Sequence, residues 1–342
     1  MGYFGARKTP GGFVVGEVVS ALQKSIRRGD EEGALTWATE LDRAGFGDYV
    51  WKRLRIIASE DVGIGDPAAM VATRVLYEAW RARATAEKKA WKDGDPQPRV
   101  SRLYLVEAVK SLARARKSRI GDHVYLLFFQ GDRAQLAPRS FRKSWGKAEL
   151  VSAFEQALYG SREEEALFLA AELDEQDGSK THVWPLIERL AASRPVASPV
   201  TVVLRLDWEQ EAARERKTKI EPSESRLILG VAIVSVMRDL GDPAELVAKV
   251  DELTATETIV ANQALVDELY RYDRKATVTI PDHALDQHTQ RGRRLGRGIE
   301  YSFSENGPLH LENRAGVDDP YEERAIASDI AHHHAQAARR AA

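Results

Sequence analysis

The chain has 342 residues, of which 43% are hydrophobic and 30% are charged, a composition that is typical of globular proteins and excludes a largely disordered chain. Lys and Arg number 50 against 52 Asp and Glu, so the net charge of −2 points to no nucleic-acid or membrane partner by itself. There is no cysteine, which excludes a disulfide scaffold, thiolate catalysis and a sulfur-ligated zinc site. No apolar run approaches the ~18 residues of a membrane span, and no secretory leader is recognisable. We therefore expect a cytoplasmic protein.

Apolar residues recur at helical spacing through the first quarter of the chain. Between Val14 and Arg28 they form the stripe of an amphipathic helix, which Gly29 ends. Two further helices are expected to begin at Asp30 and Asp48. A fourth has Asp66-Pro67 as its N-cap and first residue and extends to about Arg83. This pattern favours a helical bundle.

The rest of the chain is less regular. We expect a loop at residues 92–98, a helix from Ser101, an apolar run of undecided type at Val124–Phe129, and a helix at Thr256–Tyr272. Ala276–Ile280 has β character, and Ile299–Leu311 is predicted to form a hairpin that turns at residues 305–308. The last residues, with His332–His334, are expected to be a frayed helix or a tail.

The sequence contains an internal repeat. Glu17-Val-Val-Ser-Ala-Leu22 matches Glu149-Leu-Val-Ser-Ala-Phe154 at an offset of 149 − 17 = 132. Beyond the first of these segments, eight more residues are identical to the residues 132 positions later: Glu31, Glu32, Ala34, Leu35, Ala38, Glu40, Leu41 and Asp42. With small changes of offset, Val50-Trp51 matches Val183-Trp184 and Arg102-Leu103 matches Arg226-Leu227. The alternative is a chance likeness of two amphipathic helices; we favour duplication.

These patterns predict an all-α protein of two tandem helical-bundle units with a small basic α+β extension. The expected divisions are a tail at 1–13, the units at 14–146 and 147–254, a connecting helix at 255–275, the extension at 276–325, and a tail at 326–342.

Three motifs in the first unit resemble the C-terminal domain of the RarA/MgsA family, the replication-associated recombination ATPases related to Werner-helicase-interacting protein. The motifs are Ser20-Ala-Leu-Gln-Lys-Ser-Ile-Arg27, Ile57-Ala-Ser-Glu-Asp-Val-Gly-Ile-Gly-Asp-Pro67, and Leu112-Ala-Arg-Ala-Arg-Lys-Ser118 with Tyr125. Their order and spacing match the family over residues 18–125. The resemblance implies a helical module that mediates oligomerisation beside an AAA+ clamp-loader-like motor, in a family that acts at stalled forks and single-stranded DNA junctions.

The departures from the family are informative. The family carries its ATPase before this domain, whereas about a dozen residues precede it here. The phosphate-binding pattern Gly-x4-Gly-Lys-[Ser/Thr] is missing from the sequence, and Gly178-Ser-Lys-Thr181 lacks the upstream glycine. The second copy has lost the Ser-Glu-Asp-Val-Gly and Asp-Pro signatures. We therefore expect a module without its motor and without a cofactor.

A basic segment gives the first candidate site. Residues 81–148 contain 17 Lys and Arg against six acidic residues, a local balance of 17 − 6 = +11, whereas residues 149–177 carry nine acidic residues and one arginine. Four cations are dense enough to follow a nucleic-acid backbone: Arg114, Arg116, Lys117 and Arg119. The alternatives are a solvated helix face and a basic first unit that docks on the acidic second one.

The second candidate is Pro281–Gly298, where four arginines are spaced by glycines: Arg291, Arg293, Arg294 and Arg297. Arginine forks suit phosphate oxygens, and His283 and His288 are predicted to help bind phosphate. The string resembles extensions found on some proteins related to this family. The alternatives are a flexible connector and a metal-dependent phosphoesterase built on Asp282, His283 and Asp286; we expect neither a metal nor catalysis here.

The carboxylate pair at residues 60–61 has a structural interpretation. Glu60 and Asp61 point away from each other on a helix, so we do not expect them to share acid–base chemistry. We expect Ser59 and Asp61 to brace the turn instead.

The leading functional hypothesis is a non-catalytic, self-associating module that binds single-stranded or forked DNA. The alternative is a protein scaffold or regulator of a clamp-loader-like AAA+ ATPase.

Overall fold

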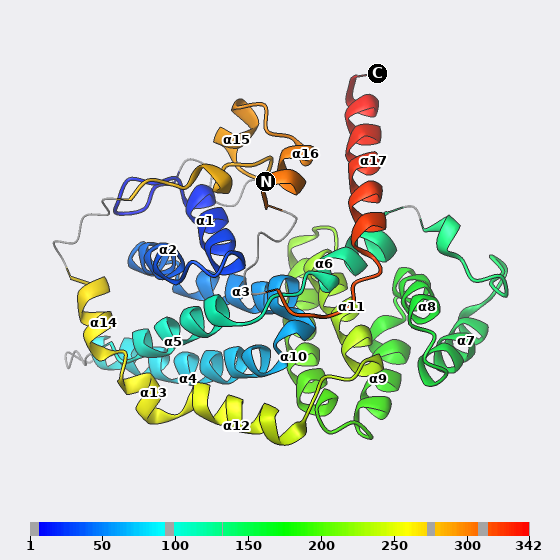
Figure 1. Cartoon of the computed structure of the whole chain (residues 1–342), viewed down its shortest axis with the longest axis horizontal. Coiled ribbons are helices and arrows are strands. Elements are labelled where there is room, and N and C mark those ends of the chain that lie inside the picture. Colours follow the sequence, from blue (N-terminus) through cyan, green and yellow to red (C-terminus); the bar gives the residue numbers. More distant parts are fainter. Residues whose placement is uncertain (1–6, 93–98, 132, 272–277, 307–313, 342) are drawn as a thin grey trace. The chain divides into compact units, whose positions relative to one another are not determined.

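The computed structural model describes residues 7–92, 99–131, 133–271, 278–306 and 314–341, and these ranges are mostly helical (Figure 1). The helices of residues 7–131 are α1 (Val15–Arg27), α2 (Glu31–Arg43), α3 (Gly47–Ile57), α4 (Pro67–Lys92), α5 (Ser101–Arg114) and α6 (Ile120–Val124). Those of residues 133–254 are α7 (Lys147–Tyr159), α8 (Glu163–Glu175), α9 (Trp184–Ala191), α10 (Ala197–Thr218), α11 (Glu224–Met237) and α12 (Pro243–Thr254). The later ones are α13 (Thr256–Val260), α14 (Gln263–Leu269), α15 (Gln290–Arg294), α16 (Ile299–Tyr301) and α17 (Glu322–Ala341).

The all-α prediction is confirmed, because the described ranges contain isolated β-bridges but no strand. The predicted β character of the extension is not found there. Val278–Ile280 is not a strand, and the remainder of that predicted segment lies outside the described residues. Ile299–Asn306 forms helical turns, so the hairpin predicted to begin at Ile299 is wrong for this part; residues 307–313 lie outside the description. A strand needs a hydrogen-bonding neighbour, and no described strand offers one.

Several boundaries also differ from the sequence prediction. The fourth helix continues to Lys92 instead of ending near Arg83. In the apolar run at residues 124–129, Val124 ends α6 and the other residues belong to the π-helical turn Tyr125–Gln130. The segment expected as one helix at Thr256–Tyr272 is divided into α13 and α14. The last residues belong to the long helix α17.

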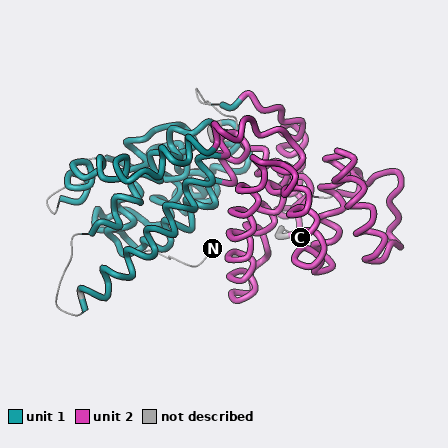
Figure 2. The backbone as a smooth tube through the Cα atoms, turned by 90° about the horizontal axis from the view of Figure 1, so that it is seen from below, with its two compact units in different colours: residues 1–58, 68–117, 247–315 teal, residues 59–67, 118–246, 316–342 magenta. Residues whose placement is uncertain are grey.

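The chain divides into two compact units, each made of segments that are distant in sequence (Figure 2). Unit 1 comprises Met1–Ala58, Ala68–Lys117 and Val247–Ala315. Unit 2 comprises Ser59–Pro67, Ser118–Leu246 and Gly316–Ala342. Helices α1 to α5 thus lie mainly in unit 1, and α7 to α11 lie in unit 2.

Unit 1 follows local rules at its helix ends and buries an aromatic core. The Asp30 side chain accepts a hydrogen bond from the Gly33 N–H at 2.9 Å and so caps α2. Gly45, at φ +82°, follows that helix in the left-handed conformation that glycine tolerates. Trp51 of α3 and Trp80 of α4 lie with ring centroids 5.6 Å apart, and both are buried. Helix α2 packs on both α1 and α5.

Unit 2 has the same order of helices at the predicted offset. Helices α1 and α7 are each 13 residues long, as are α2 and α8, and both pairs are 132 positions apart. Helix α8 packs on α7 and α11, as α2 packs on α1 and α5. Trp184 and Trp208 also have ring centroids 5.6 Å apart.

Polar contacts recur between corresponding helices. Asp42 pairs with Arg102 at 3.6 Å in unit 1, and Asp174 pairs with Arg226 at 2.7 Å in unit 2. The carboxylate of Glu87 accepts hydrogen bonds from the Ser101 N–H and hydroxyl at 2.9 and 2.6 Å. Corresponding bonds join Glu215 to the Ser225 N–H, at 3.3 Å, and to its hydroxyl. These contacts join helices that correspond in the predicted repeat, and the duplication itself stays a prediction.

Candidate nucleic-acid interface

Arg114 ends α5 and is exposed, but its charge is paired. Its Nε and Nη2 atoms donate to the two carboxylate oxygens of Glu31 at 2.5 and 3.0 Å. The hydrogen bond to Glu31 raises the pKa of Arg114. A guanidinium that already makes two hydrogen bonds to one carboxylate binds a phosphate less strongly.

Lys117 is fully buried, which the dense run of cations in the sequence does not suggest. Its ammonium donates to the main-chain carbonyls of Leu112, Ala113 and Ala115 at 2.9, 2.9 and 2.5 Å. These carbonyls belong to the last turn and end of α5, where no intrahelical donor follows. Lys117 therefore acts as a C-terminal cap of α5, and its position does not fit a contact with nucleic acid.

Arg119 is also buried and is used within unit 2. Its guanidinium pairs with Asp122, and its Nε atom lies 3.7 Å from Asp61 Oδ1. The Asp61 carbonyl accepts from the Ser118 N–H at 3.0 Å. Two of the family-like motifs thus meet at Asp61, whose position agrees with a bracing role. Of the four predicted cations in this segment, Arg116 alone is both exposed and without a carboxylate partner among the described residues.

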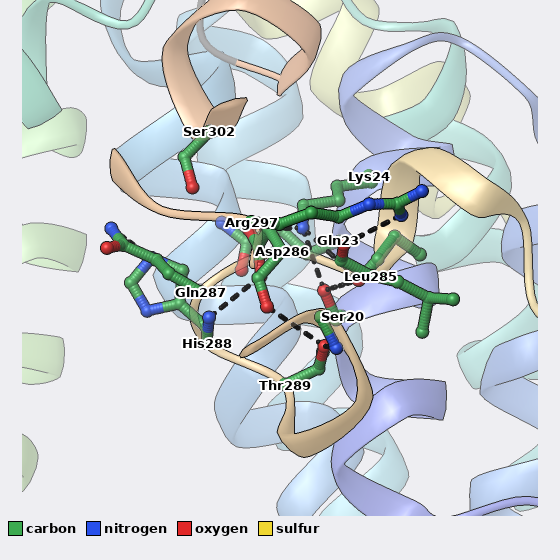
Figure 3. Close-up of polar contacts among 12 residues, drawn as sticks. Ser20, Gln23, Lys24, Leu285, Asp286, Gln287, His288, Thr289, Arg297 and Ser302 are labelled. Carbon is green, nitrogen blue, oxygen red and sulfur yellow. Dashed lines mark hydrogen bonds and ion pairs between the residues drawn. The ribbon is translucent and has the colours of Figure 1, made fainter. Parts of the chain in front are cut away.

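The second candidate segment is anchored to α1 by a buried ion pair (Figure 3). The Lys24 ammonium lies 2.5 Å from Asp286 Oδ2, and both side chains are almost completely buried. Lys24 also donates to Ser20 at 2.9 Å, and the Ser20 hydroxyl donates to the Ala284 carbonyl at 2.7 Å. Burial lowers the pKa of Lys24 to about 8, although Asp286 opposes this shift. Lys24 therefore remains charged at neutral pH.

Asp286 also organises the backbone that follows it. Its Oδ1 atom accepts from the His288 N–H at 2.9 Å. The Thr289 hydroxyl donates to the Asp286 carbonyl at 3.0 Å and accepts from the Gly292 N–H at the same distance, capping α15. A Cβ atom on Gly292 would lie 2.0 Å from the Asp286 carbonyl oxygen, so this close approach requires glycine. The segment is a folded element of unit 1.

The four arginines of this segment are not equivalent. Arg297 binds both carboxylate oxygens of Asp282 at 2.7 Å and lies over the Tyr301 ring. Arg291 is 3.4 Å from Glu17. Arg293 and Arg294 are exposed, and neither pairs with a carboxylate within the described ranges; Arg293 donates to the Gln287 carbonyl at 2.9 Å.

The two histidines have different environments. Burial lowers the pKa of His283 to about 4, and the positive charges of Arg28 and Lys24 act in the same direction. Its ring is therefore neutral at neutral pH and supplies no positive charge to a phosphate. His288 is exposed. Asp282 lies in the short helical turn Asp282–Ala284, which ends before Asp286.

The described residues contain no group of three or more His, Cys, Asp or Glu side chains that could hold a metal ion. No helix among them is both long and apolar enough to cross a membrane.

Sequence reasoning named the arginines but missed Lys24, the residue that fixes their segment. One signal was available, since Lys24 lies in the family-like motif of residues 20–27. Its partner is 262 positions away, so the sequence did not identify the pair.

Comparison with known proteins supports the resemblance in part of the chain. Over 66 residues the chain is 47% identical to replication-associated recombination protein A of Haemophilus influenzae and 46% identical to that of Escherichia coli, in each case 19% of this chain and 14% of the relative. Over 102 residues it is 38% identical to the Bacillus subtilis protein of the same name, covering 30% of this chain and 21% of that relative. No family model matches the chain, and no solved structure does. The similarity to this family is confirmed for the matched stretches.

Proposed function

We propose that the chain is a non-catalytic, self-associating module that binds DNA in replication or repair. The observation that carries this proposal is the similarity of a stretch of 102 residues to a replication-associated recombination protein. The sequence has no Gly-x4-Gly-Lys-[Ser/Thr] loop, which favours a role that does not include nucleotide hydrolysis.

The surface of unit 1 supports contact with phosphates through three residues. Arg116, Arg293 and Arg294 are exposed, and no carboxylate among the described residues neutralises them. Exposed guanidinium groups with unused donors are suited to phosphate oxygens. The other predicted cations act within the fold and are therefore unsuitable as probes of binding.

Fluorescence anisotropy with labelled single-stranded and forked DNA at two salt concentrations tests the proposal. We expect binding that weakens steeply with salt, since each phosphate contact releases counterions. The triple variant Arg116→Gln, Arg293→Gln and Arg294→Gln should bind more weakly with a shallower salt dependence. Absence of binding at low salt would overturn the DNA-associated role. Light scattering tests self-association, and a mass equal to one chain would exclude it.

A second candidate is a scaffold or regulator of a clamp-loader-like AAA+ ATPase without DNA contact. It is favoured by the internal use of Arg114, Lys117 and Arg119, which reduces the basic surface that the sequence suggested. Affinity purification of the tagged full chain tests it. Recovery of such an ATPase, together with no DNA retention, would support this candidate over the first.

A further inference from the structure

We propose that the segment Arg139–Lys147, which leads into α7 in unit 2, is a binding platform for single-stranded nucleic acid. It carries four cations, Arg139, Arg142, Lys143 and Lys147, and all are exposed. With Glu149 in the first turn of α7, the charge over residues 139–149 is 4 − 1 = +3. The inference deepens the proposed function, on which it rests, by placing DNA contact on a different element.

Aromatic residues alternate with these cations and are fixed in place. Phe141 packs edge-on against the buried Phe168 of α8, with ring centroids 5.0 Å apart. Trp145 packs against Phe141 at 5.7 Å and is itself only partly buried. A partly exposed indole held by a second ring offers a surface on which a base can stack.

The cations are not neutralised by their surroundings. Arg142 donates to the carbonyls of Arg139 and Phe141 at 2.8 Å, which are uncharged partners, and Lys147 donates to the Gln176 carbonyl at 2.6 Å. For Arg139 and Lys143 no carboxylate partner exists among the described residues.

Acidic groups at the end of α8 are already engaged elsewhere in unit 2. Glu172 and Glu175 pair with Arg133 at 2.8 and 2.6 Å. Asp174 pairs with Arg226. The positive charge of Arg139–Lys147 is therefore available to a ligand.

The corresponding segment of unit 1 shows that the fold does not need the cations and the indole of Arg139–Lys147. At the offset of 132, Thr9-Pro10-Gly11-Gly12-Phe13 corresponds to Phe141-Arg142-Lys143-Ser144-Trp145. In unit 1 this turn carries no charged side chain, and it packs against the rest of the unit. The Gly11 N–H donates to Glu40 at 2.5 Å, and Phe13 packs on Trp37 at 5.5 Å. Both turns lead into a 13-residue helix, so the two added charges and the indole of unit 2 are not required for helix entry.

Interleaved cations and rings favour single-stranded nucleic acid over an acidic protein, because bases stack on aromatic faces while the backbone contacts the cations. The segment is about nine residues, enough to contact a few nucleotides of the ~4–16 that single-strand-binding folds cover.

The test is anisotropy with a labelled oligothymidylate of roughly 20 nucleotides, longer than such a site, and the full chain. The variant Arg139→Gln with Lys143→Gln removes two charges that make no contact within the turn. The control Arg216→Gln with Lys217→Gln removes two exposed neighbouring charges from the end of α10 in the same unit. We expect the first pair to weaken binding roughly tenfold and to lower the salt slope by about 1.4, with little change in the control.

Trp145→Leu tests stacking separately and should weaken binding by at least about fivefold. Circular dichroism should give unchanged helix content for the charge variants. No binding by the wild-type chain would overturn the proposed function together with this inference. Wild-type binding that both Arg139/Lys143 and Trp145 variants retain, or an equal loss in the control, would overturn this inference alone. Polyglutamate binding in place of oligothymidylate would also overturn it, in favour of an acidic protein partner.

Discussion

Arg114 and Glu31 form a two-point ion pair between α5 and α2, and Arg238 and Glu163 form its counterpart between α11 and α8. The glutamates are 132 positions apart, which is the offset of α2 and α8, and the arginines are 124 apart, which is the offset at which Arg102 matches Arg226. A residue that the sequence suggests as a DNA ligand is thus part of a contact found in both units. Such a contact is explained by the fold without reference to a ligand.

The two arginines should differ in their contribution to stability. The Arg238 side chain is 19% exposed and also donates to the Asp318 carbonyl, whereas Arg114 is 64% exposed. We expect Arg238→Gln to lower the free energy of unfolding by about 2 kcal/mol. The reason is that the partly buried carboxylate of Glu163 would lose its cationic partner. Arg114→Gln should lower it by about 0.2–1 kcal/mol. Urea denaturation measures both, and equal losses would contradict the assignment.

Lys117→Met should destabilise the protein without acting on DNA contacts directly. Three carbonyls at the end of α5 would lose their donor, and an unsatisfied buried polar group costs about 1–3 kcal/mol. We expect a loss of roughly 3 kcal/mol in urea denaturation, net of the desolvation of the ammonium that the variant avoids. The neighbouring exposed Arg116→Met is the control, with a change within about 0.5 kcal/mol. A stable Lys117→Met that binds DNA weakly would restore Lys117 as a ligand.

Lys24→Met should release the segment 281–301 from α1. Removing one partner of a buried ion pair leaves the other charge uncompensated and costs about 3–5 kcal/mol. Hydrogen exchange of the Leu285–Leu295 amides should accelerate, and Lys24→Met with Asp286→Asn should recover part of the protection. Gln156 holds the corresponding position on α7 and is exposed, so Gln156→Met is the matched control. Equal exchange in the single and double variants would show that the ion pair does not hold the segment.

Gly292→Ala should have a similar local effect for a steric reason. The added Cβ would meet the Asp286 backbone at 2.0 Å, so the turn must open. Gly16→Ala in α1 meets no atom within 4 Å and should stabilise the chain by about 0.5–1 kcal/mol. Thermal unfolding and hydrogen exchange together distinguish Gly292→Ala from Gly16→Ala. Unchanged amide protection in Gly292→Ala would contradict the close approach of Gly292 to the Asp286 backbone.

Stability should fall as the pH drops from 6.5 toward 4, in part because of His283. Its folded pKa is about 4 against an ordinary value of 6.5, so in this window the unfolded chain binds a proton that the folded chain does not. His283→Gln should reduce this part of the pH dependence, as measured by urea denaturation at several pH values. A wild-type profile in His283→Gln would exclude this residue as a source.

The sequence alone determined the all-α class, the positions of α1 to α3, the offset of 132 and the likeness to the recombination proteins. These features depend on periodicity, caps and motifs, which are properties of neighbouring residues. The state of each charge was decided only by the tertiary structure. In the sequence Lys117 looks like a surface cation, but in the structure its ammonium binds carbonyls at the end of α5. Lys24 binds Asp286, which is 262 positions away in the sequence. Burial and ion pairing depend on which distant segments meet, so the same basic residues became a helix cap, an anchor or an exposed donor according to their neighbours.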